Sequence, residues 1–176
     1  MSTLNVDNIN EYTTGNGVEI PGHILQVKSQ FFDTQTSISG SSFADTGLTL
    51  AITPSATSSK ILCCFYVSMS GQDNSYVALK MFRDSTEIGT TTNTGTGVEC
   101  FTGLSFRDTG NSSYSVPTVP MIFLDSPSST SSITYKVQAS PMRTSSKAMY
   151  INRSYNLGDD NQFRAVSNVI LMEVGG

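Results

Sequence analysis

The chain has 176 residues, of which 38% are hydrophobic and only 14% are charged, and its formal net charge is −4 with a pI near 4.8. The ten lysines and arginines form no run, so the sequence lacks the basic face that nucleic-acid-binding proteins need, and no apolar stretch is long enough to span a membrane. We therefore expect neither a nucleic-acid partner nor membrane insertion.

Uncharged hydroxyl groups supply much of the polar character. The 27 serines and 21 threonines suit an all-β protein, because threonine favours strands and serine favours turns. A low charge density also suits a protein packed among many copies in a large assembly, where repulsion between neighbours would be costly. The three cysteines have no motif spacing, which argues against a disulfide framework and indicates synthesis in a reducing cytosol.

Residues 1–22 form a segment distinct from the rest. Two turn signals, Gly15-Asn16-Gly17 and Pro21-Gly22, interrupt its sparse apolar residues. Such a segment cannot bury enough surface to fold alone, but three copies wound around a common axis would bury one another's apolar side chains. The residues expected to do so are Leu4, Val6, Ile9, Val18 and Ile20. We therefore predict that residues 1–22 are an intertwined β extension for trimerisation and attachment, followed by a β domain at 23–176.

Residues 23–176 alternate between apolar and polar residues almost throughout, which is typical of half-buried strands. Eight segments show this period of two, and clusters of Ser, Thr, Gly, Asn and Pro separate them. They are 48–52, 59–70, 75–82, 98–106, 120–125, 132–139, 148–152 and 167–174. Since no window has the caps and the 3.6-residue period of a helix, we expect eight or nine strands after residue 22.

These strands predict an all-β fold, an antiparallel β-sandwich or jelly roll, because regularly spaced strands in one domain of this size form such folds. The strand at 60–69 is apolar on both faces and should be central. The last strand, 169–174, is also apolar on both faces and should be tied into the core.

Few residues are candidates for chemistry. His23 is the only histidine, which excludes a Ser-His-Asp triad or a histidine metal cluster within one chain. In a trimer, three copies of His23 could meet near the axis and bind a metal ion or an anion, or His23 could be an ordinary junction residue. Asp159, Asp160 and Asn161 offer oxygen ligands for calcium, but they lack the EF-hand spacing and are also normal turn residues. We therefore predict no catalytic residue, no cofactor and no metal site, and we expect no enzymatic activity.

The cysteines and two tyrosines complete the candidates. Cys63 and Cys64 are adjacent on a strand and must point to opposite faces, so they cannot share a site. We expect both, and Cys100, to be buried free thiols. Tyr114 and Tyr155 lie in loop-like stretches, which makes them the better candidates among the tyrosines for contact with a partner.

The N-terminal segment TLNVDNINEYTTGNGVEI resembles the short β-prism motifs of bacteriophage tail-fibre and head-fibre proteins, in which x-V-x-x-I-x-E is followed by a glycine-containing turn and G-V-x-I. Several later stretches resemble small β domains of marine phage appendage proteins. They are GLTLAITPSATSSKIL, FLDSPSSTSSITYKVQ, YINRS and the terminal ILMEV. The resemblance thus involves the extension and several strands of the domain.

The resemblance implies a non-enzymatic structural protein of a virion, assembled in the bacterial cytoplasm. It would form a homotrimer, attach to other virion proteins by its N-terminus like a tail fibre, and display the β domain for adhesion to a host-surface polysaccharide or receptor. Two alternatives stay open. The first is a capsid decoration or head-fibre protein that stabilises the shell, and the second is a lectin-like carbohydrate-binding module without a particle.

Overall fold

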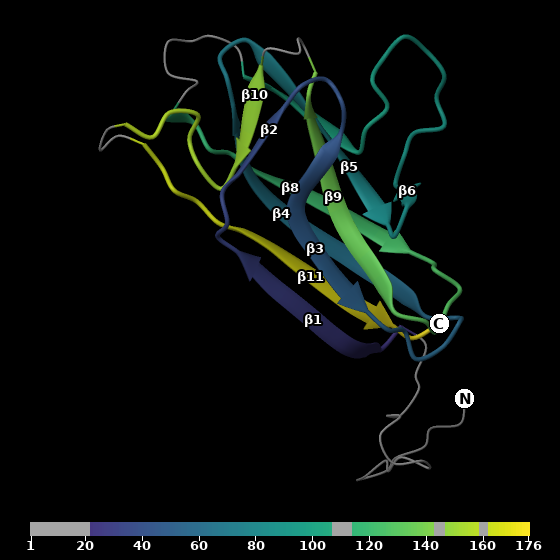
Figure 1. Ribbon diagram of the computed structural model, residues 1–176. Helices are drawn as coiled ribbons and strands as arrows, with labels where there is room; N and C mark the ends of the chain where they lie inside the picture. The colour runs from purple at the N-terminus through teal and green to yellow at the C-terminus, as the bar shows by residue number, and fades with distance from the viewer. Residues whose placement is uncertain (1–21, 107–113, 143–146, 159–161) are drawn as a thin grey trace, which may run out of the picture.

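The computed structural model describes residues 22–106, 114–142, 147–158 and 162–176 (Figure 1). In these ranges the chain forms eleven β-strands. They are β1 (Ile24–Phe32), β2 (Thr36–Ser39), β3 (Ala44–Ile52), β4 (Lys60–Gly71), β5 (Ser75–Arg83), β6 (Thr86–Ile88), β7 (Thr102–Phe106), β8 (Thr118–Asp125), β9 (Ile133–Pro141), β10 (Ala148–Ile151) and β11 (Ser167–Val174).

The strands make two antiparallel sheets. The first sheet has the order β1-β11-β4-β10-β2, with β8 paired to the other side of β4. The second sheet has the order β3-β9-β5-β6, with β7 also paired to β5. The two sheets overlap in Figure 1 and enclose one hydrophobic core, which confirms the predicted β-sandwich. Jelly-roll connectivity and the trimer stay predictions.

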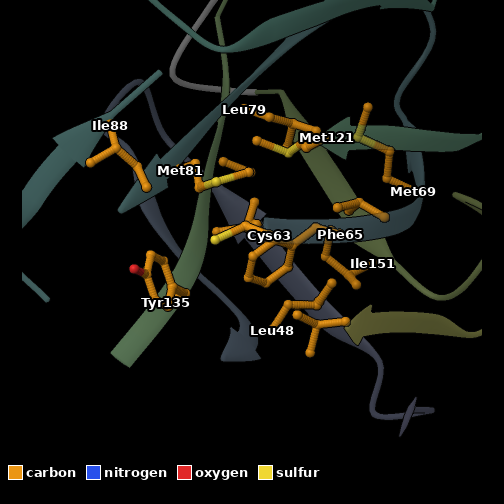
Figure 2. Packing of buried hydrophobic residues seen from close by; sticks show 14 of the residues in the cluster. Leu48, Cys63, Phe65, Met69, Leu79, Met81, Ile88, Met121, Tyr135 and Ile151 are labelled. Atoms are coloured by element: carbon orange, nitrogen blue, oxygen red, sulfur yellow. The ribbon is translucent and has the colours of Figure 1, made fainter. Parts of the chain in front are cut away.

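The core is built from alternate residues of the facing strands, as the period of two requires. Figure 2 shows Cys63, Phe65 and Met69 of β4 packed in one cluster with Met81 of β5 and Tyr135 of β9. All of these residues are fully buried. β4 pairs with β11, β8 and β10, so the prediction that it is central is confirmed. β11 lies between β1 and β4, which confirms that the last strand is tied into the fold.

One predicted strand begins too early. The alternation at residues 98–106 predicts a continuous strand, but β7 starts only at Thr102. Val98 is 53% exposed, and Phe101 packs its ring edge-on against Phe123 at a centroid distance of 6.4 Å. The apolar residues before Thr102 therefore belong to a loop, and their spacing does not reflect a buried sheet face.

Three strands of the structure, β1, β2 and β6, were not predicted. β2 and β6 have only four and three residues, which is too little alternation to detect. β1 has nine residues, but Lys28, Ser29 and Gln30 are three polar residues in a row and interrupt its alternation.

Two buried carboxylates are stabilised inside the sandwich by hydrogen bonds. Arg83 Nη1 donates hydrogen bonds to both carboxylate oxygens of Asp125, at 2.9 Å each, and Tyr135 Oη donates to Oδ2 of Asp125 at 2.7 Å. Glu173 accepts hydrogen bonds from the Ser55 backbone N–H and hydroxyl at 2.6 Å and from Gln26 Nε2 at 2.5 Å. These contacts are required because an unpaired carboxylate in a core is strongly destabilising.

Candidate interaction surfaces

One end of the sandwich, here called the base, holds both ends of the described chain. The Gly22 N–H donates to the carbonyl of Gly175, and the Gly175 N–H donates to the carbonyl of His23, both at 2.8 Å. The described chain therefore both begins and ends at the base, where β1 starts and β11 finishes (Figure 1). The predicted oligomerisation residues lie outside the described part of the chain. They are Leu4, Val6, Ile9, Val18 and Ile20.

The loop between β10 and β11 lies at the opposite end, here called the loop end. β11 runs from Ser167 to Val174 and reaches the base at its last residue, where Val174 pairs with Ile24. At about 3.4 Å per residue, the start of β11 lies roughly 25 Å from the base. The turn that joins β4 to β5 is at this end too (Figure 1).

The loop end brings the two tyrosines predicted for partner contact into one region. The Ser154 hydroxyl donates to the carbonyl of Tyr114 at 3.1 Å, and Tyr155 follows directly in the chain. The Tyr155 ring lies 5.6 Å from the ring of Tyr150, and the Arg153 guanidinium stacks over the Tyr150 ring at 4.5 Å. Aromatic faces beside a guanidinium can stack on a sugar ring and donate hydrogen bonds to its hydroxyls.

Asn152 fixes this loop to the sandwich. Its backbone has φ of 62°, a left-handed conformation in which asparagine is tolerated better than most residues. Its side-chain amide donates to the carbonyls of Phe32 and Thr34 at 3.1 and 2.9 Å and accepts from the Ser167 hydroxyl at 2.6 Å. The position of Arg153 and Tyr155 thus depends on one fully buried residue.

The first sheet has an apolar outer surface. Across β1, β11, β4 and β8, directly paired residues form three rows that point away from the core. The rows are Val27-Met172-Leu62-Leu124, Ser29-Ile170-Cys64-Ile122 and Phe31-Asn168-Tyr66-Pro120. These twelve residues are called the outer face below. All of them lie in the described part of the chain, and none of them is charged.

Much of the outer face is accessible. The exposed fraction is 62% for Phe31, 55% for Val27 and Ile122, 49% for Leu124 and 37% for Tyr66. Soluble monomers rarely leave such large apolar residues side by side on one surface, whereas single exposed ones are common. The outer face is therefore the clearest candidate interaction surface in the described structure.

The opposite surface of the sandwich has a different character. On the outside of the second sheet, Lys136 pairs with Asp45 at 3.0 Å and Lys80 pairs with Glu87 at 2.7 Å. The Lys136 ammonium also lies 6.0 Å from the ring centre of Phe82. Charged groups that screen the apolar rings below them are what a water-facing sheet requires. The two outer surfaces of one domain thus differ, and only the surface of the first sheet is apolar and uncharged over its centre.

The sequence contains a signal for the outer face that our predictions did not use. Segments 60–69 and 169–174 are apolar on both faces, and from this we predicted only a central strand and a last strand tied into the core. In a two-layer sandwich, however, a strand has a second layer on one side only. The second apolar face of β4 and β11 therefore has no layer of the described chain over it and is partly accessible to solvent in the single chain.

Ion-binding residues do not gather in the described ranges. Those ranges contain no group of three or more His, Cys, Asp or Glu that could hold a metal ion, and no helix with the length and apolar character to cross a membrane. His23 is exposed at the base. Asp159, Asp160 and Asn161 lie outside the described residues.

The three cysteines are free thiols, as predicted, but they are not equally buried. Cys63 lies in the core, where burial raises the pKa of its thiol. Cys64 is half-buried at the centre of the outer face, and burial also raises its pKa. Cys100 is half-buried as well, so the expectation of full burial is wrong for Cys64 and Cys100. The reactivity of the Cys64 thiol can therefore show whether the outer face is covered.

Comparison with known proteins does not add a relative. A scan against protein-family models matches none to the chain, and a search of curated proteins finds no match.

Proposed function

We propose that the chain is a non-enzymatic structural protein of a bacteriophage virion, a trimeric surface appendage of the tail-fibre type. In this role residues 1–22 knit three chains and attach them to other virion proteins. The β domain is displayed at a distance from the particle, where it contacts a polysaccharide or receptor on the host surface.

The observation that supports this proposal is that the chain enters the domain at one end and the candidate contact loop lies at the other. The chain enters the sandwich at the base, where Gly22 and Gly175 are hydrogen-bonded. The loop that contains Tyr155 lies at the opposite end (Figure 1). A domain attached through its N-terminus would therefore present the loop end to its surroundings. Repeated copies would then raise the overall affinity of individually weak contacts.

Two further readings remain as alternatives, each with one observation in its favour. A capsid decoration or head-fibre protein that stabilises the shell would use broad contacts between subunits, which the apolar outer face could supply. A lectin-like module would use the cluster of Tyr150, Arg153 and Tyr155, whose rings and guanidinium suit a sugar.

Immunogold electron microscopy of intact particles tests the virion role. Antibodies raised against the recombinant full chain should label the tail of phage particles from the source. Label on the head would favour the decoration role, and unlabelled particles would refute both virion roles. The control is the same antibody pre-absorbed with the recombinant protein.

Adhesion is tested separately with host cells and the full-length chain. Replacing Tyr155 by alanine should reduce binding to the cells, whereas replacing Ile24, which is 48% exposed at the base, should have little effect. Equal binding by both variants would remove Tyr155 from the proposed contact. Binding to isolated polysaccharides in the absence of particles would favour the lectin-like reading.

A further inference from the structure

We propose that the outer face of the first sheet is the surface through which copies of this chain pack against one another. The inference goes beyond the proposed function, because it places a subunit interface on the folded β domain, whereas the proposed function assigns the knitting of chains to residues 1–22. It does not depend on the virion role.

The first argument is the apolar area that the single chain leaves in water. Taking roughly 200 Å² for a fully exposed large side chain, the five exposed large apolar residues of the outer face present on the order of 500 Å². A stable protein interface buries about 800 Å² on each partner, with an apolar centre and a polar rim. The outer face has the size of such a centre, and Ser29 and Asn168 contribute polar groups near its β1 edge.

The second argument concerns the kind of partner. The chain has a net charge of −4, but the outer face has none of the charged residues. Two copies can therefore meet there without repulsion between like charges, whereas a phosphate backbone or an anionic lipid surface would find no counter-charge. Lys60 is the first residue of β4, one register beyond Leu62 and toward the base, so it lies at the margin of the face.

The third argument is the shape of the surface and its contrast with the opposite one. Four neighbouring strands make the outer face about 14 Å wide between its outermost backbones, which suits another broad sheet surface better than a single peptide strand. The ion pairs Lys136–Asp45 and Lys80–Glu87 occupy the outside of the second sheet, where they would face water in an assembly. Packing through the first sheet thus covers the apolar surface and leaves the charged one exposed.

The native mass of the full-length chain tests the interface. Ile122 lies in the middle row of the outer face and is 55% exposed. The chain with glutamate at this position should therefore still fold, but the substitution places a charge in the interface. Val98 is a matched control, because it is 53% exposed and lies in the loop between β6 and β7, two strands of the second sheet. Light scattering over a range of concentrations should show an oligomer for the unchanged chain and for Val98→Glu. For Ile122→Glu, the midpoint of association should move to a concentration at least about tenfold higher.

A second variant and a folding check keep the test decisive. Circular dichroism should show the same β spectrum for all variants. If Ile122→Glu does not fold, Phe31→Glu replaces it, since Phe31 lies on the edge strand β1 and is 62% exposed.

The thiol of Cys64 provides an independent readout of the same face. In the assembled chain, Cys64 should react with a thiol reagent more slowly than Cys100. Phe31→Glu, at a position that is not paired with Cys64, should raise the rate at Cys64 alone. Labelled peptides identified by mass spectrometry distinguish the two sites.

Three outcomes would overturn the inference in distinguishable ways. A monomeric unchanged chain with protected Cys64 would mean that something other than another copy covers the face. A monomer with reactive Cys64 would mean that the face stays open. An oligomer whose mass is unaffected by Ile122→Glu and whose Cys64 rate is unaffected by Phe31→Glu would assign association to residues outside the face, and would leave the proposed trimerisation through residues 1–22 intact. Conversely, particles without immunogold label would refute the virion role but not the interface.

Discussion

Replacing Asn152 by alanine tests how the loop end is held in place. Asn152 is fully buried and has φ of 62°. Its side chain donates to the carbonyls of Phe32 and Thr34, at 3.1 and 2.9 Å, and accepts from the Ser167 hydroxyl at 2.6 Å. It thus connects the loop after β10 to the end of β1 and the start of β11. Alanine removes all three hydrogen bonds and must also adopt the left-handed backbone conformation.

The expected loss of stability follows from these contributions. Each of the three hydrogen bonds contributes about 1 kcal/mol net. The left-handed conformation costs alanine about 1 kcal/mol more than it costs glycine. Asn152→Ala should therefore lower the free energy of unfolding by about 4 kcal/mol, which for a chain of this length lowers Tm by roughly 10 °C. Asn152→Gly should lose only about 3 kcal/mol, because it relieves the backbone term.

Urea unfolding at one fixed protein concentration measures both variants. The chain has seven tyrosines and no tryptophan, so tyrosine fluorescence and far-ultraviolet circular dichroism are suitable probes. An alanine variant within about 0.5 kcal/mol of the unchanged chain, the range of ordinary surface substitutions, would refute the role assigned to Asn152. If the glycine and alanine variants lose the same stability, the backbone contribution is refuted and the hydrogen bonds alone remain.

Three further predictions concern the interior of the sandwich. Burial alone would raise the pKa of Glu173, but hydrogen bonds from neighbouring groups outweigh it and lower the pKa. The stability that this carboxylate contributes should therefore be present above its unfolded pKa of about 4.3 and be lost as the pH falls through its folded pKa. In urea unfolding, the difference in unfolding free energy between the unchanged chain and Glu173→Gln should therefore shrink from pH 7 toward acid pH. Asp125→Ala should cost about 3 kcal/mol in the same assay because it leaves buried donors without an acceptor, whereas Asp45→Ala, which breaks a pair whose carboxylate is 58% exposed, should cost less than about 1 kcal/mol. Gly71→Ala should lower Tm, since the added Cβ would lie 2.5 Å from Cδ2 of Phe106 and the loss would be about 2 kcal/mol; an unchanged Tm would show that the ring moves aside freely.

The sequence was sufficient to predict the fold class because period-two alternation is a local property. Seven of the eight predicted segments overlap most of a strand of the structure, with ends that differ by up to four residues, and the eighth, 98–106, contains β7 only in its second part. β1, β2 and β6 have no predicted counterpart. What failed there is instructive. Val98 and Cys100 alternate like core residues, but their loop does not pair with a neighbouring strand over its whole length, and pairing is a long-range property that alternation does not encode.

The contacts that stabilise the loop end could not have been predicted. Asn152 is the last residue of the predicted strand segment 148–152, and nothing in its neighbouring residues indicates a hydrogen bond to a distant part of the chain. Its role depends on Phe32 and Thr34, which lie about 120 residues earlier in the chain. The stacking of Arg153 on Tyr150 is likewise a consequence of how this loop folds back over β10. Tyr114 and Tyr155 were selected only because they lie in loops, and the sequence did not indicate that they share one end of the sandwich.

The unusual composition and the outer face have one common physical explanation. A domain that works alone in water needs polar or charged residues on the outside of both sheets. β4 and β11 instead place Leu62, Cys64, Ile170 and Met172 on the outside of the first sheet, while ion pairs occupy the outside of the second. In a lone chain, such an exposed apolar face adds no stability and promotes association with other molecules. If copies of the chain cover it, the low charge content and the two-sided apolar strands are both expected, because an interface centre excludes charge in the same way that a core does.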